Sequence, residues 1–171
     1  MTENSEKLIK IFEYALNQEN TGISFFKTSL NRMGMGAAVS AFKKLIEEEY
    51  NHVAFITKII KELKEGNSID SAGLQNFTIP ATNYFDERAT SEFLQQCIEG
   101  SMIPDVTVFN TAWLIEKDLS EFYGKMAARI EEPRSKEAFE MLASWEKAHE
   151  KFFRRFRDEL SAIYEKMPWG G

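Results

Sequence analysis

The chain has 171 residues and a mass of 19.7 kDa, with 43 % hydrophobic residues and a net charge of −6. This length and apolar content favour one folded domain and exclude a largely disordered chain. The acidic balance argues against a general nucleic-acid binder. A single cysteine, Cys97, excludes a disulfide framework or a cysteine-based metal cluster within one chain. Without an apolar signal-peptide core or a run approaching ~18 apolar residues, a cytoplasmic protein that makes no membrane contact is expected.

Glycine and proline are sparse and divide the chain into its predicted elements. The pattern predicts four long helices, at roughly 5–33, 35–65, 105–131 and 133–165. Gly34 and Gly36 mark the boundary between the first two helices, and Pro133 suits the first turn of the last helix. The segment 66–104 is richer in breakers and is expected to be a crossover with one short helix at 91–102. The fold class is therefore all-α.

Each long helix carries an apolar stripe with alternating three- and four-residue steps, as in a helix bundle. In the third helix the predicted stripe includes Trp113 and Tyr123. The charged and imidazole side chains that interrupt the four stripes are Glu19, Glu49, His52, Glu116, Glu146 and His149. Glu47 and Glu48, beside Glu49, are expected on a solvated face.

The chain contains an internal repeat. A shift of 97 positions superposes Glu19 on Glu116, Glu49 on Glu146 and His52 on His149, and it matches many apolar residues as well. A duplicated helical hairpin is the simplest explanation. We expect one domain over residues 1–171, made of hairpins 5–65 and 105–165, the crossover 66–104 and a short C-terminal tail.

The interrupting residues have the spacing of metal ligands. Glu49 and His52, like Glu146 and His149, lie three apart on one helix face, and each pair follows a lone stripe glutamate by thirty residues. Four carboxylates in an apolar core repel one another, and two divalent cations offset that charge. This ligand set suits iron or manganese. The alternative is a metal-free bundle whose polar groups satisfy one another.

The motifs resemble those of the rubrerythrin-like branch of the ferritin-like di-iron superfamily. The stretch from Ala15 to Phe26, with Glu19 six residues before an aromatic pair, and its repeat from Ala112 to Tyr123 are similar to the family's first and third helices. Glu-Glu-Glu49-Tyr-Asn-His52 and Trp-Glu146-Lys-Ala-His149 are similar to its second and fourth. The resemblance implies a ferritin-like four-helix bundle with two iron ions, manganese being possible.

The resemblance also implies a role for each ligand. Glu49 and Glu146 would bridge the two metals. Glu19 and His52 would complete one metal position, and Glu116 and His149 the other. From its place on the apolar stripe two turns after Glu116, Tyr123 could hydrogen-bond an oxygen species bound to the metals or relay an electron, or be a core aromatic with a satisfied hydroxyl.

The chain departs from rubrerythrins proper at two points. Leu119 stands where they carry an extra glutamate, and the rubredoxin-type iron site, which needs two Cys-x-x-Cys pairs, is absent from a chain with Cys97 alone. The resemblance implies an oxidoreductase that reduces H2O2 or O2 with electrons from an external donor such as a rubredoxin-like protein, and we expect a homodimer. The alternatives are a ferritin-type ferroxidase or iron-storage protein, and an oxygenase, for which the sequence holds no substrate motif.

Overall fold

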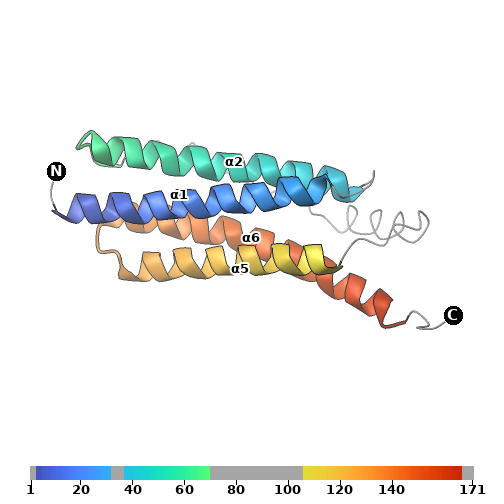
Figure 1. Ribbon diagram of the computed structural model, residues 1–171. Helices are drawn as coiled ribbons and strands as arrows, with labels where there is room; N and C mark the ends of the chain where they lie inside the picture. The colour runs from blue at the N-terminus through green and yellow to red at the C-terminus, as the bar shows by residue number, and fades with distance from the viewer. Residues whose placement is uncertain (1–2, 32–36, 70–105, 167–171) are drawn as a thin grey trace.

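The computed structural model describes residues 3–31, 37–69 and 106–166. These residues form four helices, α1 (Glu3–Leu30), α2 (Ala37–Lys64), α5 (Val106–Arg129) and α6 (Pro133–Tyr164) (Figure 1). The expected all-α, ferritin-like four-helix bundle is confirmed, and each helix lies within a few residues of its predicted range. The short helix expected at 91–102 and the end of the C-terminal tail lie outside the described residues.

Two helix ends show how local sequence sets the boundaries. The Glu132 carboxylate accepts hydrogen bonds from the backbone N–H groups of Arg134 and Ser135, at 3.0 and 2.6 Å, so it caps α6 while Pro133 occupies the first helical position. At the end of α2, Gly66 adopts a positive φ of 77°. This left-handed residue lets Asn67 N–H donate to the Glu62 carbonyl at 2.9 Å, which closes the last turn.

The helices form two antiparallel hairpins, α1 with α2 and α5 with α6, that lie side by side (Figure 1). The ribbon shows α2 and α5 running in the same direction, so the chain leaves one end of the bundle and re-enters at the other. None of the four described helices combines the length and the apolar composition that a membrane-spanning segment needs.

The buried apolar residues gather in two clusters along the bundle. The first includes Phe12 of α1, Phe55 of α2 and Phe139 of α6, and the second includes Phe26 of α1 and Phe153 of α6. In α1 the two clusters are separated by the turn that carries the buried Glu19. A polar layer therefore crosses the bundle between two dry, aromatic-rich halves.

The stripe predicted for the third helix is displaced by one residue at Trp113. Ala112 is fully buried, whereas Trp113 is half-buried and packs under the Arg157 guanidinium, whose central carbon lies 4.0 Å from the ring centroid. The small alanine belongs to the second cluster, and the indole packs against the outside of that cluster with its Nε1 atom buried.

Candidate metal centre

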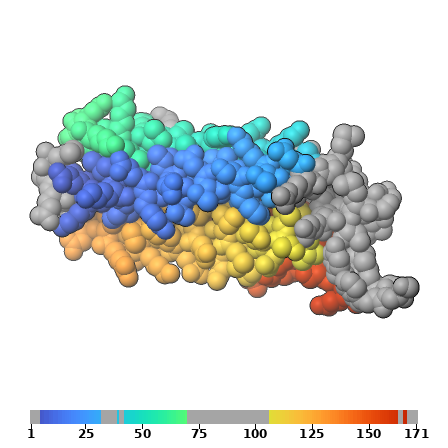
Figure 2. Space-filling model, viewed as in Figure 1, coloured from blue at the N-terminus to red at the C-terminus, as the bar shows by residue number. Residues whose placement is uncertain are grey.

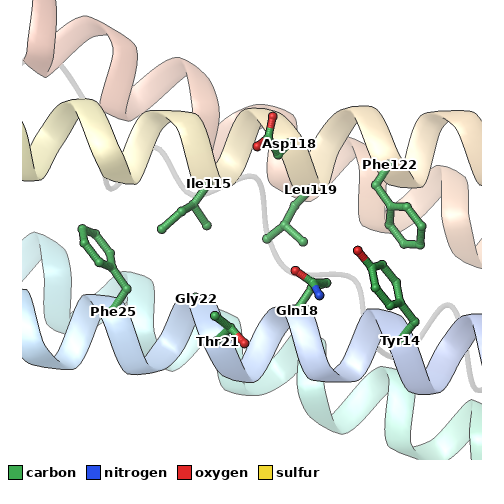
Figure 3. Close-up of a pocket in the computed structure, with 9 residues that line it drawn as sticks. All are labelled: Tyr14, Gln18, Thr21, Gly22, Phe25, Ile115, Asp118, Leu119 and Phe122. Atoms are coloured by element: carbon green, nitrogen blue, oxygen red, sulfur yellow. The ribbon is translucent and has the colours of Figure 1, made fainter.

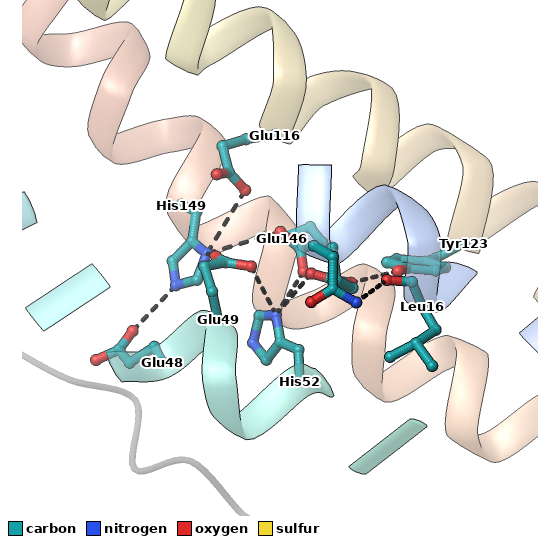
Figure 4. A network of polar contacts seen from close by, with 10 residues as sticks. Leu16, Glu48, Glu49, His52, Glu116, Tyr123, Glu146 and His149 are labelled. Carbon is teal, nitrogen blue, oxygen red and sulfur yellow. Dashed lines mark hydrogen bonds and ion pairs between the residues drawn. The ribbon is translucent and has the colours of Figure 1, made fainter. Parts of the chain in front are cut away.

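The six polar residues of the predicted stripes meet in one layer in the middle of the bundle (Figure 4). One glutamate comes from α1 and one from α5, and α2 and α6 each provide a glutamate and a histidine three residues apart. All six are buried: Glu19, Glu49, His52, Glu116 and Glu146 are 0 % exposed, and His149 is 3 % exposed. The helical spacing and the duplication together place them there.

Within the layer, the possible metal-binding atoms form two groups of four residues. Each residue of a group offers an atom that lies within 4.8 Å of the others' atoms. One group is Glu19, Glu49, His52 and Glu146, and the other is Glu49, Glu116, Glu146 and His149. Glu49 and Glu146 belong to both groups, which is the arrangement that bridging carboxylates require.

His52 turns its Nδ1 atom toward the carboxylates. This atom lies 2.7 Å from Glu146 Oε1, 3.4 Å from Glu49 Oε2 and 3.6 Å from Glu19 Oε2. On its other side, the ring stacks on the indole of Trp145, with ring centroids 5.1 Å apart and planes 14° apart.

His149 occupies the equivalent place in the other group. Its Nδ1 lies 2.9 Å from Glu49 Oε1, 3.6 Å from Glu116 Oε2 and 3.6 Å from Glu146 Oε2. Its Nε2 lies 3.0 Å from Glu48 Oε2, a carboxylate of α2 that is itself buried. Both imidazoles thus present Nδ1 to a set of three carboxylates.

Comparison with known proteins agrees with this geometry. The rubrerythrin family model matches residues 10–157, which include the whole polar layer. The chain belongs to the rubrerythrin family. No curated protein and no solved structure matches it.

Bound cations would satisfy groups that the rubrerythrin-family fold otherwise leaves without partners. Among the residues that the structure describes, no hydrogen-bond donor serves either carboxylate oxygen of Glu49, Glu116 or Glu146, or Oε2 of Glu19. Their nearest basic atoms are the Nδ1 atoms of the two histidines, which would themselves bind a cation. Leaving charged oxygens buried in this way is costly unless a cation binds them. The donor set is four carboxylates and two imidazoles without thiolate, which suits iron or manganese. The residues present therefore fit a dinuclear site.

The carboxyl groups of the layer divide into two pairs with opposite pKa shifts. Burial, with repulsion from Glu146 and Glu49, raises the pKa of Glu19 well above its usual value, and burial with the same two neighbours raises the pKa of Glu116. Burial also opposes ionisation of Glu146 and Glu49, but the positive charge of His52 and contacts from both histidines outweigh it and lower the pKa of each carboxyl. The shared carboxylates are thus the most strongly ionised.

The histidines show the reciprocal effect. Burial alone would lower the pKa of His52, but the Glu146 and Glu49 carboxylates raise it well above its usual value. The pKa of His149 is likewise raised against burial, first by Glu116 and then by Glu146. In the metal-free protein, protons on the two histidines and on Glu19 and Glu116 offset part of the negative charge that two cations would otherwise offset.

Tyr123 lies at the edge of the layer and is fully buried. Its hydroxyl donates a hydrogen bond to Glu19 Oε1 across the α5–α1 interface (Figure 4). Burial, followed by the nearby Glu19 charge, raises its pKa well above its usual value, so the phenol keeps its proton. The sequence left open whether Tyr123 belongs to the site or only to the core; its hydroxyl contacts a predicted ligand.

A pocket of about 390 Å³ lies between α1 and α5 (Figure 3). These two helices share one face of the molecule in the space-filling view (Figure 2). The pocket is lined by Tyr14, Gln18, Thr21, Gly22, Phe25, Ile115, Asp118, Leu119 and Phe122. Leu119 stands one turn after Glu116, at the position where the resemblance leads one to expect a further glutamate, so this wall of the pocket is apolar.

The expectation for Glu48 was wrong. Glu47 is exposed as predicted, but Glu48 is only 3 % exposed and contacts His149 on the opposite hairpin. Trp145, which stacks on His52, was not assigned to the site either. The repeat could have indicated both residues, because Glu48 and Trp145 occupy equivalent positions, each immediately before one of the two shared glutamates.

Proposed function

We propose that this chain is a di-iron oxidoreductase that reduces hydrogen peroxide or dioxygen, with electrons supplied by an external donor such as a rubredoxin-like protein. The observation that carries the proposal is the buried layer in which two ligand groups share Glu49 and Glu146. Membership of the rubrerythrin family supports the choice of iron.

Two ferrous ions in this layer would supply two electrons and Lewis acidity to a bound oxidant. Reducing one H2O2 to two waters consumes two electrons and two protons, so the external donor must return two electrons for each turnover. Residues 1–171 contain one cysteine and no Cys-x-x-Cys pair, so these residues by themselves cannot form a rubredoxin-type site for those electrons.

The chain's own residues would do three things. The carboxylates hold the ions by charge, and the two histidines fix one nitrogen each toward them. The apolar clusters on both sides of the layer keep bulk water away from the reduced centre. Tyr123 holds the Glu19 carboxylate at Oε1 through its hydroxyl proton, which orients that ligand.

The α1–α5 pocket would admit a small oxidant. Gln18 and Leu119, which line it, are adjacent to Glu19 and one turn from Glu116, respectively. A volume of about 390 Å³ accommodates molecules far larger than H2O2, so the pocket alone does not select the substrate. Selection would follow from the reactivity of the metal centre.

Anaerobic iron loading tests the proposal. We expect the chain to bind two Fe(II), and one equivalent of H2O2 to oxidise both, measured with a ferrous-specific chelator. Glu146→Gln, which alters a shared ligand, should bind less iron while keeping its helical circular dichroism. Glu140→Gln, on the exposed face of the same helix, is the matched control and should behave like the parent.

Two outcomes would contradict the proposal. Iron binding that is the same in Glu146→Gln and in the parent would place the metal elsewhere, and bound Fe(II) that reacts with neither oxidant would exclude the reaction. The mass in solution separates this function from iron storage. We expect a homodimer, at about twice 19.7 kDa, whereas a multi-subunit shell that accumulates ferric mineral would identify a storage protein.

A further inference from the structure

The two halves of the metal centre are built from repeated sequence but differ at two positions next to the ligands. The 97-residue shift pairs Glu48 with Trp145, and Phe26 with Tyr123. In each pair, one residue offers a polar group to a candidate ligand: Glu48 contacts His149, and Tyr123 contacts Glu19. The equivalent residues, Trp145 and Phe26, have no carboxylate or hydroxyl to offer. The ligands themselves are identical in the two halves.

The first difference concerns the histidines. His149 Nε2 lies 3.0 Å from Glu48 Oε2, in a buried contact between α6 and α2. A carboxylate can only accept, so the Nε2 proton of the neutral imidazole lies on this bond and leaves the Nδ1 lone pair for a cation. Such a carboxylate partner fixes the ring and makes it a stronger donor to metal.

His52 lacks this support. Its Nε2 is buried and has no hydrogen-bond partner among the residues that the structure describes, and its ring stacks on Trp145 at a centroid distance of 5.1 Å. The face of an indole ring offers no carboxylate-like acceptor in the imidazole plane. His52 is therefore held by packing, and its donor strength is not increased in the way that Glu48 increases that of His149.

The second difference concerns the two unshared glutamates. Glu19 Oε1 accepts a hydrogen bond from the buried Tyr123 hydroxyl. This bond draws charge away from the carboxylate, so Glu19 becomes a weaker donor to a cation. Within the described part of the chain, Glu116 accepts no hydrogen bond at either oxygen. The residue equivalent to Tyr123 in the other half is Phe26, which has no hydroxyl.

Both differences act in the same direction. We propose that the two metal positions are unequal, and that the position formed by Glu116 and His149 binds its ion more tightly and fills first. The position formed by Glu19 and His52 fills second and releases its ion more readily. This inference rests on the proposed dinuclear centre. Loss of a carboxylate partner of a ligating histidine typically weakens metal binding about 10–100-fold, which sets the size of the effect.

Calorimetric titration of the metal-free protein with Co(II) tests the inequality. We expect two binding steps whose dissociation constants differ by about tenfold or more. His149→Ala should remove the tighter step and His52→Ala the weaker one. Glu48→Gln should weaken the tighter step and leave the weaker step unchanged. Glu47→Gln, the exposed neighbour of Glu48 on α2, is the matched control, with both steps preserved.

Tyr123→Phe provides an independent check, because it should tighten the weaker step alone. Two equal steps in the parent, or loss of the tighter step in His52→Ala instead of His149→Ala, would overturn the inference and leave the dinuclear centre standing. If the parent binds no Co(II), the inference and the proposed function both fail. Circular dichroism of each variant ensures that only folded proteins are compared.

Discussion

Glu116→Gln should have opposite effects on the metal-free and the metal-loaded protein. Glu116 is fully buried, accepts no hydrogen bond at either oxygen from the residues that the structure describes, and has a pKa raised by burial and by repulsion from neighbouring carboxylates. A carboxyl whose folded pKa lies above its unfolded value loses stability as the pH rises through that folded pKa. Glutamine has nearly the same shape and no charge at any pH, so at a pH where His149 is neutral it removes this cost. At lower pH it would also remove the contact that favours the His149 imidazolium.

The size of the gain follows from the burial. Burying a neutral polar group without a partner costs about 1–3 kcal/mol, and burying a charged one costs more. Glutamine keeps the neutral cost and removes the additional cost of the charge, so we expect metal-free Glu116→Gln to be more stable by about 1–3 kcal/mol. For a chain of this length, 1 kcal/mol shifts the unfolding midpoint by roughly 2–4 °C, which gives an increase of roughly 2–12 °C. In the loaded protein, losing one ion at a hundredfold excess over its dissociation constant removes about 2.7 kcal/mol.

Thermal unfolding followed by circular dichroism, with chelator and with Co(II), measures both effects. Glu140→Gln, on the exposed face of α6, should change stability by no more than about 0.5 kcal/mol in either condition. If metal-free Glu116→Gln unfolds at a lower temperature than the parent, the buried carboxyl stabilises the fold and the argument from unsatisfied charge is wrong.

Three further results are expected. The metal-free protein should unfold at a lower temperature as the pH rises above about 6.5, because both buried histidines have raised folded pKa values and their stabilisation is lost on deprotonation. Glu19 and Glu116, whose folded pKa values are also raised, contribute a loss of the same sign that begins above about pH 4.3. Loading with Co(II) should flatten this dependence, since the ions replace the protons; a midpoint that rises with pH would contradict the sign. Tyr123→Phe should destabilise the metal-free protein by about 1–3 kcal/mol in urea unfolding, because Glu19 Oε1 loses its buried hydrogen-bond donor. An unchanged stability would show that this hydrogen bond contributes nothing. Gly22→Ala should stabilise the chain by up to about 1 kcal/mol, because alanine is the better helix former. The added Cβ would meet Phe26 and Ile115 at ordinary contact distances of 3.6 and 3.7 Å. A loss of stability would show that the α1–α5 contact is tighter than these distances indicate.

The sequence predicted the fold and the polar layer because both depend on spacing along single helices. A Glu-x-x-His pair must share one helix face, and an apolar stripe on both sides of it turns that face inward. Pro133 and the glutamate before it mark a helix start that needs no tertiary information. These features are local, so the pattern of residues specifies them.

The residues that the sequence misplaced, Glu48 and Trp113, depend on how each helix is rotated about its axis relative to its neighbours. Glu48 lies about 100° around α2 from Glu49, a direction that could face solvent or the next helix. It faces α6, where its carboxylate contacts the Nε2 atom of His149. The choice between Ala112 and Trp113 as the inward residue has the same origin, since both lie near the stripe and only the packing between helices decides. Contacts between helices cannot be derived from the period of one helix.

The division of ligands between the hairpins gives a metal ion a structural role as well as a chemical one. The group around His52 takes Glu146 from the second hairpin, and the group around His149 takes Glu49 from the first. Neither hairpin holds a complete group by itself, so each ion would join the two hairpins across the centre of the bundle. Metal binding would therefore stabilise the packing of one hairpin on the other. The same layer that disfavours the metal-free fold by burying charge would then favour the loaded fold by cross-linking it.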